Sequence, residues 1–413
     1  MTISQQIERA GRFRLFKGDV VIWTIYFFLC AISLIEVYSA ASTLSYGTGA
    51  FWRPILSHAL FIFMGILIVI VAHNIPSSWF KLYPFFFGGL ALILLFGLLI
   101  SGAVTNGARR WIELPGFSFQ PSEMAKGAVV IGVAFILTFF QEENGASRKA
   151  FKWILLLTGV FCLLIVSENF STAFILALVV VCQMFIGRVP LVQLGSLFGV
   201  VAVAGIIALA VIMNVPDSAL ENTKLHRLTT WKARIARFVK KDTKQLVAED
   251  FDLDKEAQTA HSHIAVAQGG LFGKGPGNSI QRDFLSHAYS DFIYAIIFEE
   301  IGLIGGTFVA LLYIVLLFRV EKIAGRCERN FPAFMALSLA LLMVVQALIN
   351  MAVAVGAMPI TGQPLPLVSR GGTSMIFNSL YIGMILSVSR FAKRRVTPAT
   401  AEARRATAAA HVE

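Results

Sequence analysis

Ten long apolar runs dominate the sequence and decide what the chain can fold into. An α-helix needs roughly 20 mostly apolar residues to cross the hydrocarbon core of a bilayer. The runs cover residues 20–42, 54–72, 79–101, 121–140, 151–167, 171–187, 191–214, 291–318, 332–356 and 371–390. The pattern predicts an all-α, polytopic integral membrane protein with about ten transmembrane helices. A large external loop is expected between the seventh and eighth helices.

The composition supports this class and excludes others. Hydrophobic residues make up 57% of the chain and charged residues 14%, whereas a soluble domain has about 45–50% and about 25%. The 35 Lys and Arg exceed the 24 Asp and Glu, which gives a net charge of +11. A nucleic-acid-binding protein would not combine such a charge with so apolar a chain, so we expect no nucleic-acid partner.

The basic residues predict the orientation. Most Lys and Arg of the termini and short loops lie on the side of the N-terminus, and the short loops of the other side hold only Arg53, Arg109, Arg110 and Arg370. Because positive residues stay inside, both termini are predicted to be cytoplasmic. The chain then consists of a basic N-terminal segment (1–19), a membrane domain (20–390) with an external loop at 215–290, and a basic, disordered tail (391–413).

Two pairs of charged residues lie within the predicted spans, where charges are costly and usually functional. Glu123 and Lys126 are three residues apart, so they can pair on one helical face. Such a pair can face a functional cavity or only tether helices, and the sequence leaves both possibilities open. Glu299 and Glu300 are adjacent in the eighth span, so at least one of them should face the bundle interior. Either can serve packing or carry a proton.

Asp291 begins the eighth span and follows a polar, glycine-rich stretch. An aspartate in this place can be catalytic or a plain helix cap. The glycine run is not a nucleotide-binding P-loop, because Gln268 and Gly275 occupy the positions of its first glycine and its final hydroxyl residue. Its backbone amides could still bind a phosphate.

Two further segments, 106–112 and 364–374, supply Arg, Trp, Gly and Ser/Thr at the same predicted water–lipid boundary. Arginine and backbone amides suit a pyrophosphate, and an aromatic ring suits a sugar face. Together the segments favour an anionic, lipid-linked, sugar-bearing substrate. Each one alone is also typical of an interfacial turn with a Trp anchor.

Five ordered motifs make the chain resemble the SEDS family (shape, elongation, division and sporulation proteins), over residues 15–395. They are Gly107–Trp111, Phe119–Glu123 with Lys126, Gly269–Gly275, Ser290–Ala295 with Glu299–Gly302, and Pro366–Ser374. The resemblance implies a peptidoglycan glycosyltransferase that polymerises lipid II at the outer face of the bacterial cytoplasmic membrane. The division branch is the most similar, which implies a role at the septum. The alternatives are an elongation-type polymerase, a lipid II flippase and a non-catalytic scaffold.

The resemblance also implies partners and residue roles. The partners are lipid II, the nascent glycan strand, a class B penicillin-binding transpeptidase and other division proteins of the membrane. Asp291 matches the family's essential aspartate and would accept a proton or hold a divalent cation such as Mg²⁺ or Mn²⁺. The expected substrate-binding residues are Arg110, Trp111, Gln120, Glu123, Lys126, Lys274, Ser369, Gly371 and Gly372. His287 and Arg370 stand where the family pattern is altered, and no role is assigned to them.

Overall fold

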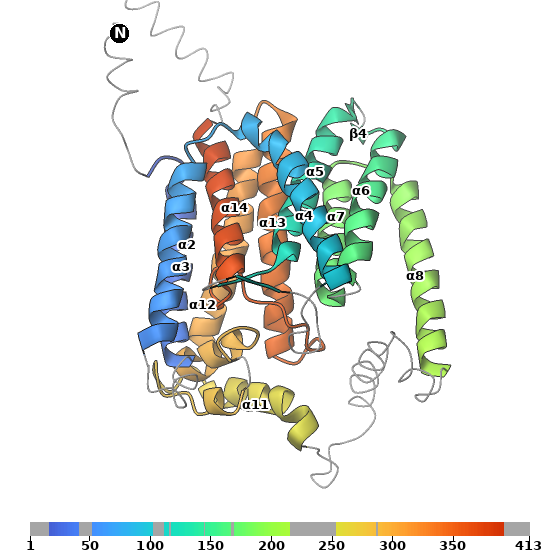
Figure 1. Cartoon of the computed structure of the whole chain (residues 1–413). Coiled ribbons are helices and arrows are strands. Elements are labelled where there is room, and N and C mark those ends of the chain that lie inside the picture. Colours follow the sequence, from blue (N-terminus) through green and yellow to red (C-terminus); the bar gives the residue numbers. More distant parts are fainter. Residues whose placement is uncertain are drawn as a thin grey trace, which may run out of the picture.

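The computed structural model describes residues 16–40, 52–101, 111–114, 117–143, 145–166, 169–214, 253–285 and 288–391. Its long helices run side by side as a bundle (Figure 1). They are α2 (Val20–Ala40), α3 (Trp52–Ala72), α4 (Tyr83–Ser101), α5 (Pro121–Phe139), α6 (Arg148–Val166), α7 (Phe170–Ile186), α8 (Leu191–Asn214), α12 (Ile293–Ala324), α13 (Asn330–Ala354) and α14 (Gly372–Phe391). The all-α, polytopic fold class is confirmed.

Each of the ten apolar runs overlaps one of these helices over most of its length. Within the described ranges, eight helices are long and apolar enough to cross a membrane, and residues 170–186 and 191–207 form shorter apolar helices. The count of ten crossings therefore stays a prediction. So do the boundaries of the external loop and of the two terminal segments, because residues 1–15, 215–252 and 392–413 lie outside the described ranges.

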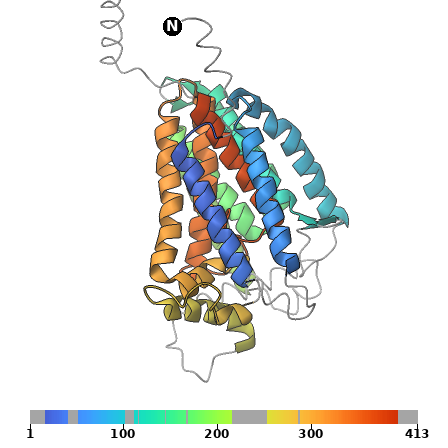
Figure 2. The ribbon, with the colours of Figure 1, turned by 90° about the vertical axis from the view of Figure 1, so that its left-hand side faces the viewer.

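The two ends of the bundle differ. At one end the backbone N–H of Asp19, just before α2, donates to Ser389 Oγ near the end of α14 (3.0 Å), and Arg319 Nη2 of α12 pairs with Asp19 Oδ2 (2.7 Å). Helix α11 (Leu253–Gly269) lies across the opposite end, which we call the α11 end (Figures 1 and 2). The first and last helices thus start and finish at the same end, which agrees with an even number of crossings.

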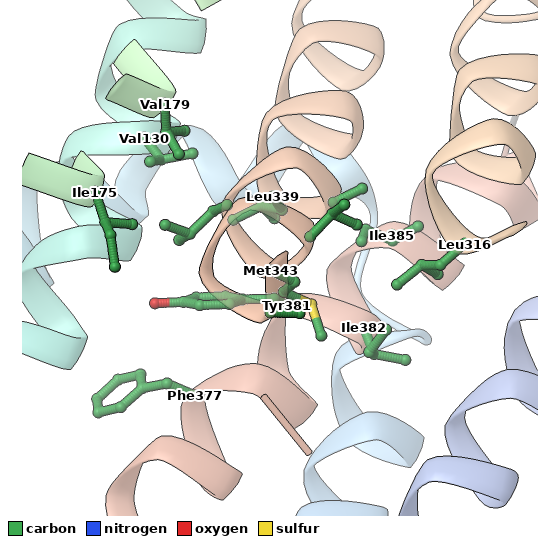
Figure 3. Packing of buried hydrophobic residues seen from close by; sticks show 14 of the residues in the cluster. Val130, Ile175, Val179, Leu316, Leu339, Met343, Phe377, Tyr381, Ile382 and Ile385 are labelled. Carbon is green, nitrogen blue, oxygen red and sulfur yellow. The ribbon is translucent and has the colours of Figure 1, made fainter. Parts of the chain in front are cut away.

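The core of the bundle is apolar, and so is much of its surface. Tyr381 and Ile385 of α14, Met343 of α13 and Val130 of α5 are buried and belong to one continuous cluster (Figure 3). Many outward side chains are also large and apolar, such as Leu163 of α6 with 74% of its surface exposed. In water this exposure would be unfavourable, and in lipid it is expected. Pro121 lies at the first position of α5, where the missing N–H of proline costs nothing.

Short irregular elements connect the helices. Two antiparallel strands, β1 (Ile112–Leu114) and β2 (Phe117–Phe119), form a hairpin directly before α5. The Phe119 ring lies 6.2 Å from that of Phe377, which joins the hairpin to α14. The remaining elements are β3 (Gln141–Glu142), β4 (Gly145–Ala146) and the 3₁₀ turns η2 (Ser77–Leu82) and η4 (Gln281–Asp283).

Helix α12 is broken at Gly302, which has φ 77° and ψ −170°. The break leaves helical groups without partners, and residues 269–281, which we call the glycine loop, replace those partners. The N–H groups of Lys274 and Gly275 donate to the carbonyls of Glu299 and Glu300 (2.9 and 2.8 Å). The N–H groups of Leu303 and Ile304 donate to the carbonyls of residues 270 and 271 (2.9 and 3.3 Å). The loop therefore completes the hydrogen bonding of both halves of the helix.

We expect Gly302→Ala to destabilise the protein. Its backbone conformation is nearly restricted to glycine and would cost another residue about 1–3 kcal/mol. A Cβ at this position would also lie 2.4 Å from the carbonyl oxygen of Leu271. The midpoint of thermal unfolding in detergent should fall clearly below that of the wild type. Gly159→Ala is the matched control, because a Cβ there meets nothing within 4 Å; equal midpoints for the two variants would contradict the prediction.

Candidate functional site at the α11 end

Asp291 lies two residues before the first residue of α12, outside the helix itself. The N-cap position is occupied by Phe292, so the carboxylate is one residue removed from the place of a plain helix cap. Ser290 Oγ donates to Asp291 Oδ1 (2.9 Å). The side chain is partly exposed, as a residue that acts on a substrate must be.

The backbone around Asp291 is held by three separate donors. The carbonyl oxygens of residues 289, 290 and 291 accept, in order, from the backbone N–H of Arg370 (2.9 Å), from Ser369 Oγ (2.5 Å) and from Asn350 Nδ2 (2.9 Å). Two of these donors come from the segment before α14 and one from α13. Three successive carbonyls fixed from two other elements leave the Asp291 segment little freedom to shift.

Helix α13 links Asp291 to the charged pair of α5. Gln346 and Asn350 are four residues apart, so they share one face of the helix about 6 Å apart along its axis. Gln346 Oε1 accepts from Lys126 Nζ (2.7 Å), and Gln346 Nε2 donates to the carbonyl of Pro364 (2.9 Å). Asn350 Nδ2 also donates to the carbonyl of Gln363 (2.7 Å). One polar face of α13 therefore organises three segments.

The predicted pair of Glu123 and Lys126 is formed. Lys126 Nζ lies 2.8 Å from Glu123 Oε1, and both side chains are almost fully buried. Glu123 Oε2 has no hydrogen-bond partner among the described residues. The pair is thus a compensated charge inside the bundle, as the cost of burying a single charge requires. Its contact with Gln346 places it in the same network as the Asp291 segment.

Both Glu299 and Glu300 are completely buried, and both turn toward the glycine loop. Glu299 accepts from Ser279 Oγ (2.5 Å) and from the N–H groups of Ile280 and Gln281 (both 3.1 Å). Glu300 accepts from the N–H groups of Gly277 (2.9 Å) and Ser279 (3.2 Å). The two carboxylates therefore bind the loop backbone and fix its path.

Lys274 takes part in this same arrangement. Its Nζ pairs with Glu299 Oε1 (2.6 Å) and donates to Gln268 Oε1 (2.6 Å). Nearby, Arg282 Nη1 donates to Ser39 Oγ of α2 (3.0 Å) and to the carbonyl of Gly277 (2.8 Å). The structure thus gives Lys274 an intramolecular carboxylate partner, and its contact with a pyrophosphate stays a prediction.

The segment before α14 packs closely. A Cβ on Gly372 would lie 2.9 Å from the Phe61 ring of α3, so the glycine allows α14 to approach α3 closely. A Cβ on Gly371 would lie 3.2 Å from the Cβ of Ser374 and 3.9 Å from that of Pro364. The Arg370 guanidinium lies over the Tyr289 ring, 5.4 Å from its centroid. Burial lowers the pKa of Arg370 from its ordinary value, but a guanidinium stays charged at neutral pH.

The remaining predicted residues lie near this end or outside the described ranges. Gln120 is buried at the start of α5 and donates from Nε2 to Ser122 Oγ (3.0 Å). Trp111 is half-buried beside the β1–β2 hairpin. Arg110 and His287 lie outside the described residues. Gln120, Glu123, Lys126, Ser369 and Asp291 belong to elements that meet around α13 and α14.

Comparison with known proteins agrees with this arrangement. Residues 19–394 match the cell cycle protein family of FtsW, RodA and SpoVE. The chain belongs to this family. The resemblance to SEDS proteins is thereby confirmed, and the match covers every described helix of the bundle.

Relatives of the family are similar over nearly the whole chain. The "Probable peptidoglycan glycosyltransferase FtsW" of Coxiella burnetii is 32% identical over 370 residues, which covers 87% of this chain and 93% of the relative. The protein of the same name from a Geobacter species, strain M18, is 32% identical over 377 residues, with 90% and 96% covered.

Two solved structures share the fold. A chain of a peptidoglycan synthase complex that coordinates polymerization and crosslinking superposes with a TM-score of 0.69 at 22% identity, covering 90% of this chain and 98% of that one. The rod shape determining protein RodA of Thermus thermophilus superposes with a TM-score of 0.62 at 22% identity, covering 91% and 98%. At 22% identity, these superpositions show that the three chains share a fold.

The sequence reasoning missed Gln346 and Asn350. Both are buried polar residues in an otherwise apolar helix, and their spacing of four residues was the available signal. Amide side chains inside membrane helices usually bond to other elements, so such a pair in a family member is a candidate for organising a site. Which elements they would reach could not be read from the sequence.

The described residues do not form a complete protein site for a divalent cation. Among them, no group of three or more His, Cys, Asp or Glu side chains could hold an ion. A Mg²⁺ ion can nevertheless be held by one carboxylate together with substrate phosphates and water. Asp291 would then be its protein ligand in this family member, and the ion would neutralise charge on the leaving pyrophosphate.

We expect Asn350→Leu to reduce glycan polymerisation by up to about a hundredfold, because a displacement of about 1 Å at a reacting group can have that effect. The substitution removes the donor to the carbonyls of Asp291 and Gln363. Polymerisation of lipid II measures the rate, and the thermal midpoint separates misfolding from misplacement.

Gln183→Leu is the matched control for this prediction. Gln183 is also a buried amide that donates to a backbone carbonyl, that of Val130 (2.9 Å). It lies near the C-terminal end of α7, whereas Thr172, which accepts from Gln363, lies at the N-terminal end. The two variants should lose similar stability. Equal polymerisation by both would contradict a positioning role of Asn350.

Proposed function

We propose that this chain is a peptidoglycan glycosyltransferase that polymerises lipid II into glycan strands at the outer face of the bacterial cytoplasmic membrane. One observation carries the proposal. The partly exposed Asp291 lies at one end of a membrane bundle on a backbone held by Arg370, Ser369 and Asn350. Membership of the FtsW/RodA/SpoVE family supports it, as do relatives that bear the name of this activity.

The reaction joins two sugars and releases a lipid pyrophosphate. The 4-hydroxyl of the GlcNAc of one lipid II attacks the anomeric carbon of the growing strand. A new C1–O4 bond forms, the bond from C1 to the pyrophosphate oxygen breaks, and undecaprenyl pyrophosphate leaves. The Asp291 carboxylate accepts the hydroxyl proton as a general base. Rigid placement of this carboxylate matters because proton transfer requires hydrogen-bond distance in the reacting complex.

The other predicted residues serve substrate binding in this proposal. The Lys126 ammonium, compensated by Glu123 and oriented by Gln346, supplies positive charge near the Asp291 network. Arg110 and Lys274 would stabilise the pyrophosphate, and Trp111 with Gln120 would contact sugar. Ser369, Gly371 and Gly372 shape the segment that holds Asp291. A pyrophosphate binds best where such donors are already in place.

A lipid II flippase is the alternative from another functional class. It would need charged groups along a path through the whole bundle. Within the described ranges, the buried charged side chains are Glu36, Glu123, Lys126, Glu299 and Glu300. Each lies in the half of its helix nearer the α11 end, which favours chemistry at one membrane boundary over transport across it.

The topology and the partners belong to the same proposal. We place the α11 end outside the cell and both termini in the cytoplasm, since basic residues gather in the loops of the other end. The relatives named FtsW support a septal role in division. A class B penicillin-binding transpeptidase would crosslink the strands, and other division proteins would recruit the pair to the septum.

Reconstitution tests the activity directly. The full chain is purified with its transpeptidase partner and supplied with lipid II, and glycan strands are separated by length on gels. We expect polymer from the complex. A complex that makes no polymer but moves lipid II across vesicle membranes would overturn the proposal in favour of the flippase. In cells, a tagged copy should gather at the septum, and lateral-wall patches would indicate the elongation role instead.

A further inference from the structure

The glycine loop presents two large apolar side chains at its turn. Leu271 and Phe272 have 60% and 78% of their surface exposed, although the neighbouring carboxylates Glu299 and Glu300 are fully buried. Exposed apolar side chains on a loop that is otherwise held by buried carboxylates call for a physical explanation. Their depth in the bundle supplies one.

The length of helix α2 gives a reference for that depth. From Val20 to Ser39 it extends for about 30 Å, which equals the thickness of the hydrocarbon core, about 30 Å. Both ends of α2 contact α12. Arg319 pairs with Asp19 at one end, and Ser39 Oγ donates to Glu300 at the other. Glu300 therefore lies near one boundary of the hydrocarbon core.

Leu271 lies on the inner side of that boundary. Its carbonyl accepts from the N–H of Ile304 (3.3 Å). Ile304 lies four residues beyond Glu300, past the break at Gly302 and toward the middle of the bundle. Ile304 itself is 55% exposed. It begins a stripe of exposed apolar residues on α12 with helical spacing, formed by Ile304, Phe308, Leu311, Val315 and Phe318. Such a stripe is typical of a lipid-facing helix surface.

We propose that Leu271 and Phe272 insert into the adjacent leaflet and contact lipid acyl chains, so that the glycine loop is anchored in the bilayer. The loop is suited to this place because its carbonyls at residues 270 and 271 and its N–H groups at residues 274 and 275 bond to α12. Backbone polar groups near hydrocarbon need such internal partners. The inference is independent of the proposed glycosyltransferase activity.

Photocrosslinking tests the anchor without any substrate. Benzoylphenylalanine replaces Phe272 in the full chain, which is reconstituted into vesicles of phosphatidylethanolamine and acyl-radiolabelled phosphatidylglycerol. Phe308 of the α12 stripe is the positive comparison. Asn278, an exposed polar residue of the same loop, is the matched control. We expect labelled adducts at Phe272 equal to those at Phe308, with none above background at Asn278.

Two outcomes would overturn the anchor. One is a Phe272 variant that labels no more than the Asn278 variant, and the other is crosslinking of Phe272 to protein in place of lipid. A second measurement does not depend on the photoreactive residue. Lipids brominated on their acyl chains should quench the fluorescence of the tryptophan introduced by Phe272→Trp but not that of Asn278→Trp. Both variants share the fluorescence of the six native tryptophans, so the comparison is made on the quenching beyond that of the wild type. Equal quenching of the two variants would also overturn it.

Discussion

Asp291→Asn should reduce lipid II polymerisation by about 10²- to 10⁴-fold, the usual contribution of a general base. The amide has nearly the shape of the carboxylate, and its oxygen can still accept from Ser290 Oγ, as Asp291 Oδ1 does at 2.9 Å. The backbone bonds from Arg370, Ser369 and Asn350 do not involve the side chain. The loss should therefore appear in the rate, with the thermal midpoint unchanged.

Asp283→Asn is the matched control for this variant. Asp283 lies eight positions earlier, and its side chain is 44% exposed beside Arg282. Removing this charge should leave polymerisation at the wild-type rate, because the carboxylate is solvent-accessible and its contact with Arg282 is long, at 3.7 Å, and such a pair contributes little. Glycan strands of wild-type length and rate from Asp291→Asn would exclude a catalytic role for the carboxylate.

Lys126→Met should cause a large loss of stability, of about 3–5 kcal/mol, because it leaves Glu123 buried without its counter-charge. The ion pair of 2.8 Å is almost fully enclosed, so water cannot replace the lysine. The double variant Glu123→Gln with Lys126→Met should recover most of the loss, since a neutral amide costs far less to bury than a charge. Thermal unfolding in detergent measures both effects, and Lys81→Met, at an exposed lysine, serves as the control.

The double variant also separates two roles of the pair. If the lysine serves substrate binding, polymerisation stays low although stability has returned. If the pair only tethers α5 to α13, activity recovers together with the thermal midpoint. We expect the first result, because Lys126 also binds Gln346 (2.7 Å), one helical turn from the residue that holds Asp291. Full recovery of activity would reduce the pair to a structural tether.

The helices could be predicted from the sequence because hydropathy over a span reports burial in lipid, whatever the details of packing. The pairing of Glu123 with Lys126 was also accessible, since a spacing of three residues on a helix fixes it locally. The break at Gly302 was not, because a glycine in an apolar run gives the same hydropathy whether its φ is negative or positive. The partners of Glu299 and Glu300 depend on a loop about 20 residues away, which no local pattern specifies.

The candidate site divides in the same way. Asp291 stood out through its position between a polar stretch and a span, and its role came from resemblance to a family. Asn350 and Gln346 could not be identified from the sequence. The sequence of an apolar helix does not reveal whether an amide side chain in it contacts a neighbouring helix or the backbone of a loop. Only the three-dimensional arrangement joins them to residues 123–126 and 289–291.

The break in α12 has a consequence for how this part of the protein opens. A continuous helix can lose a neighbouring loop and keep its own hydrogen bonds. In α12, however, the N–H groups of Leu303 and Ile304 donate to carbonyls of the glycine loop. In return, the loop N–H groups of Lys274 and Gly275 donate to carbonyls of the helix. Opening either partner strips the other of its bonds. Loop and helix therefore form one cooperative unit. A fluctuation of the loop is transmitted into the helix that begins two residues after Asp291.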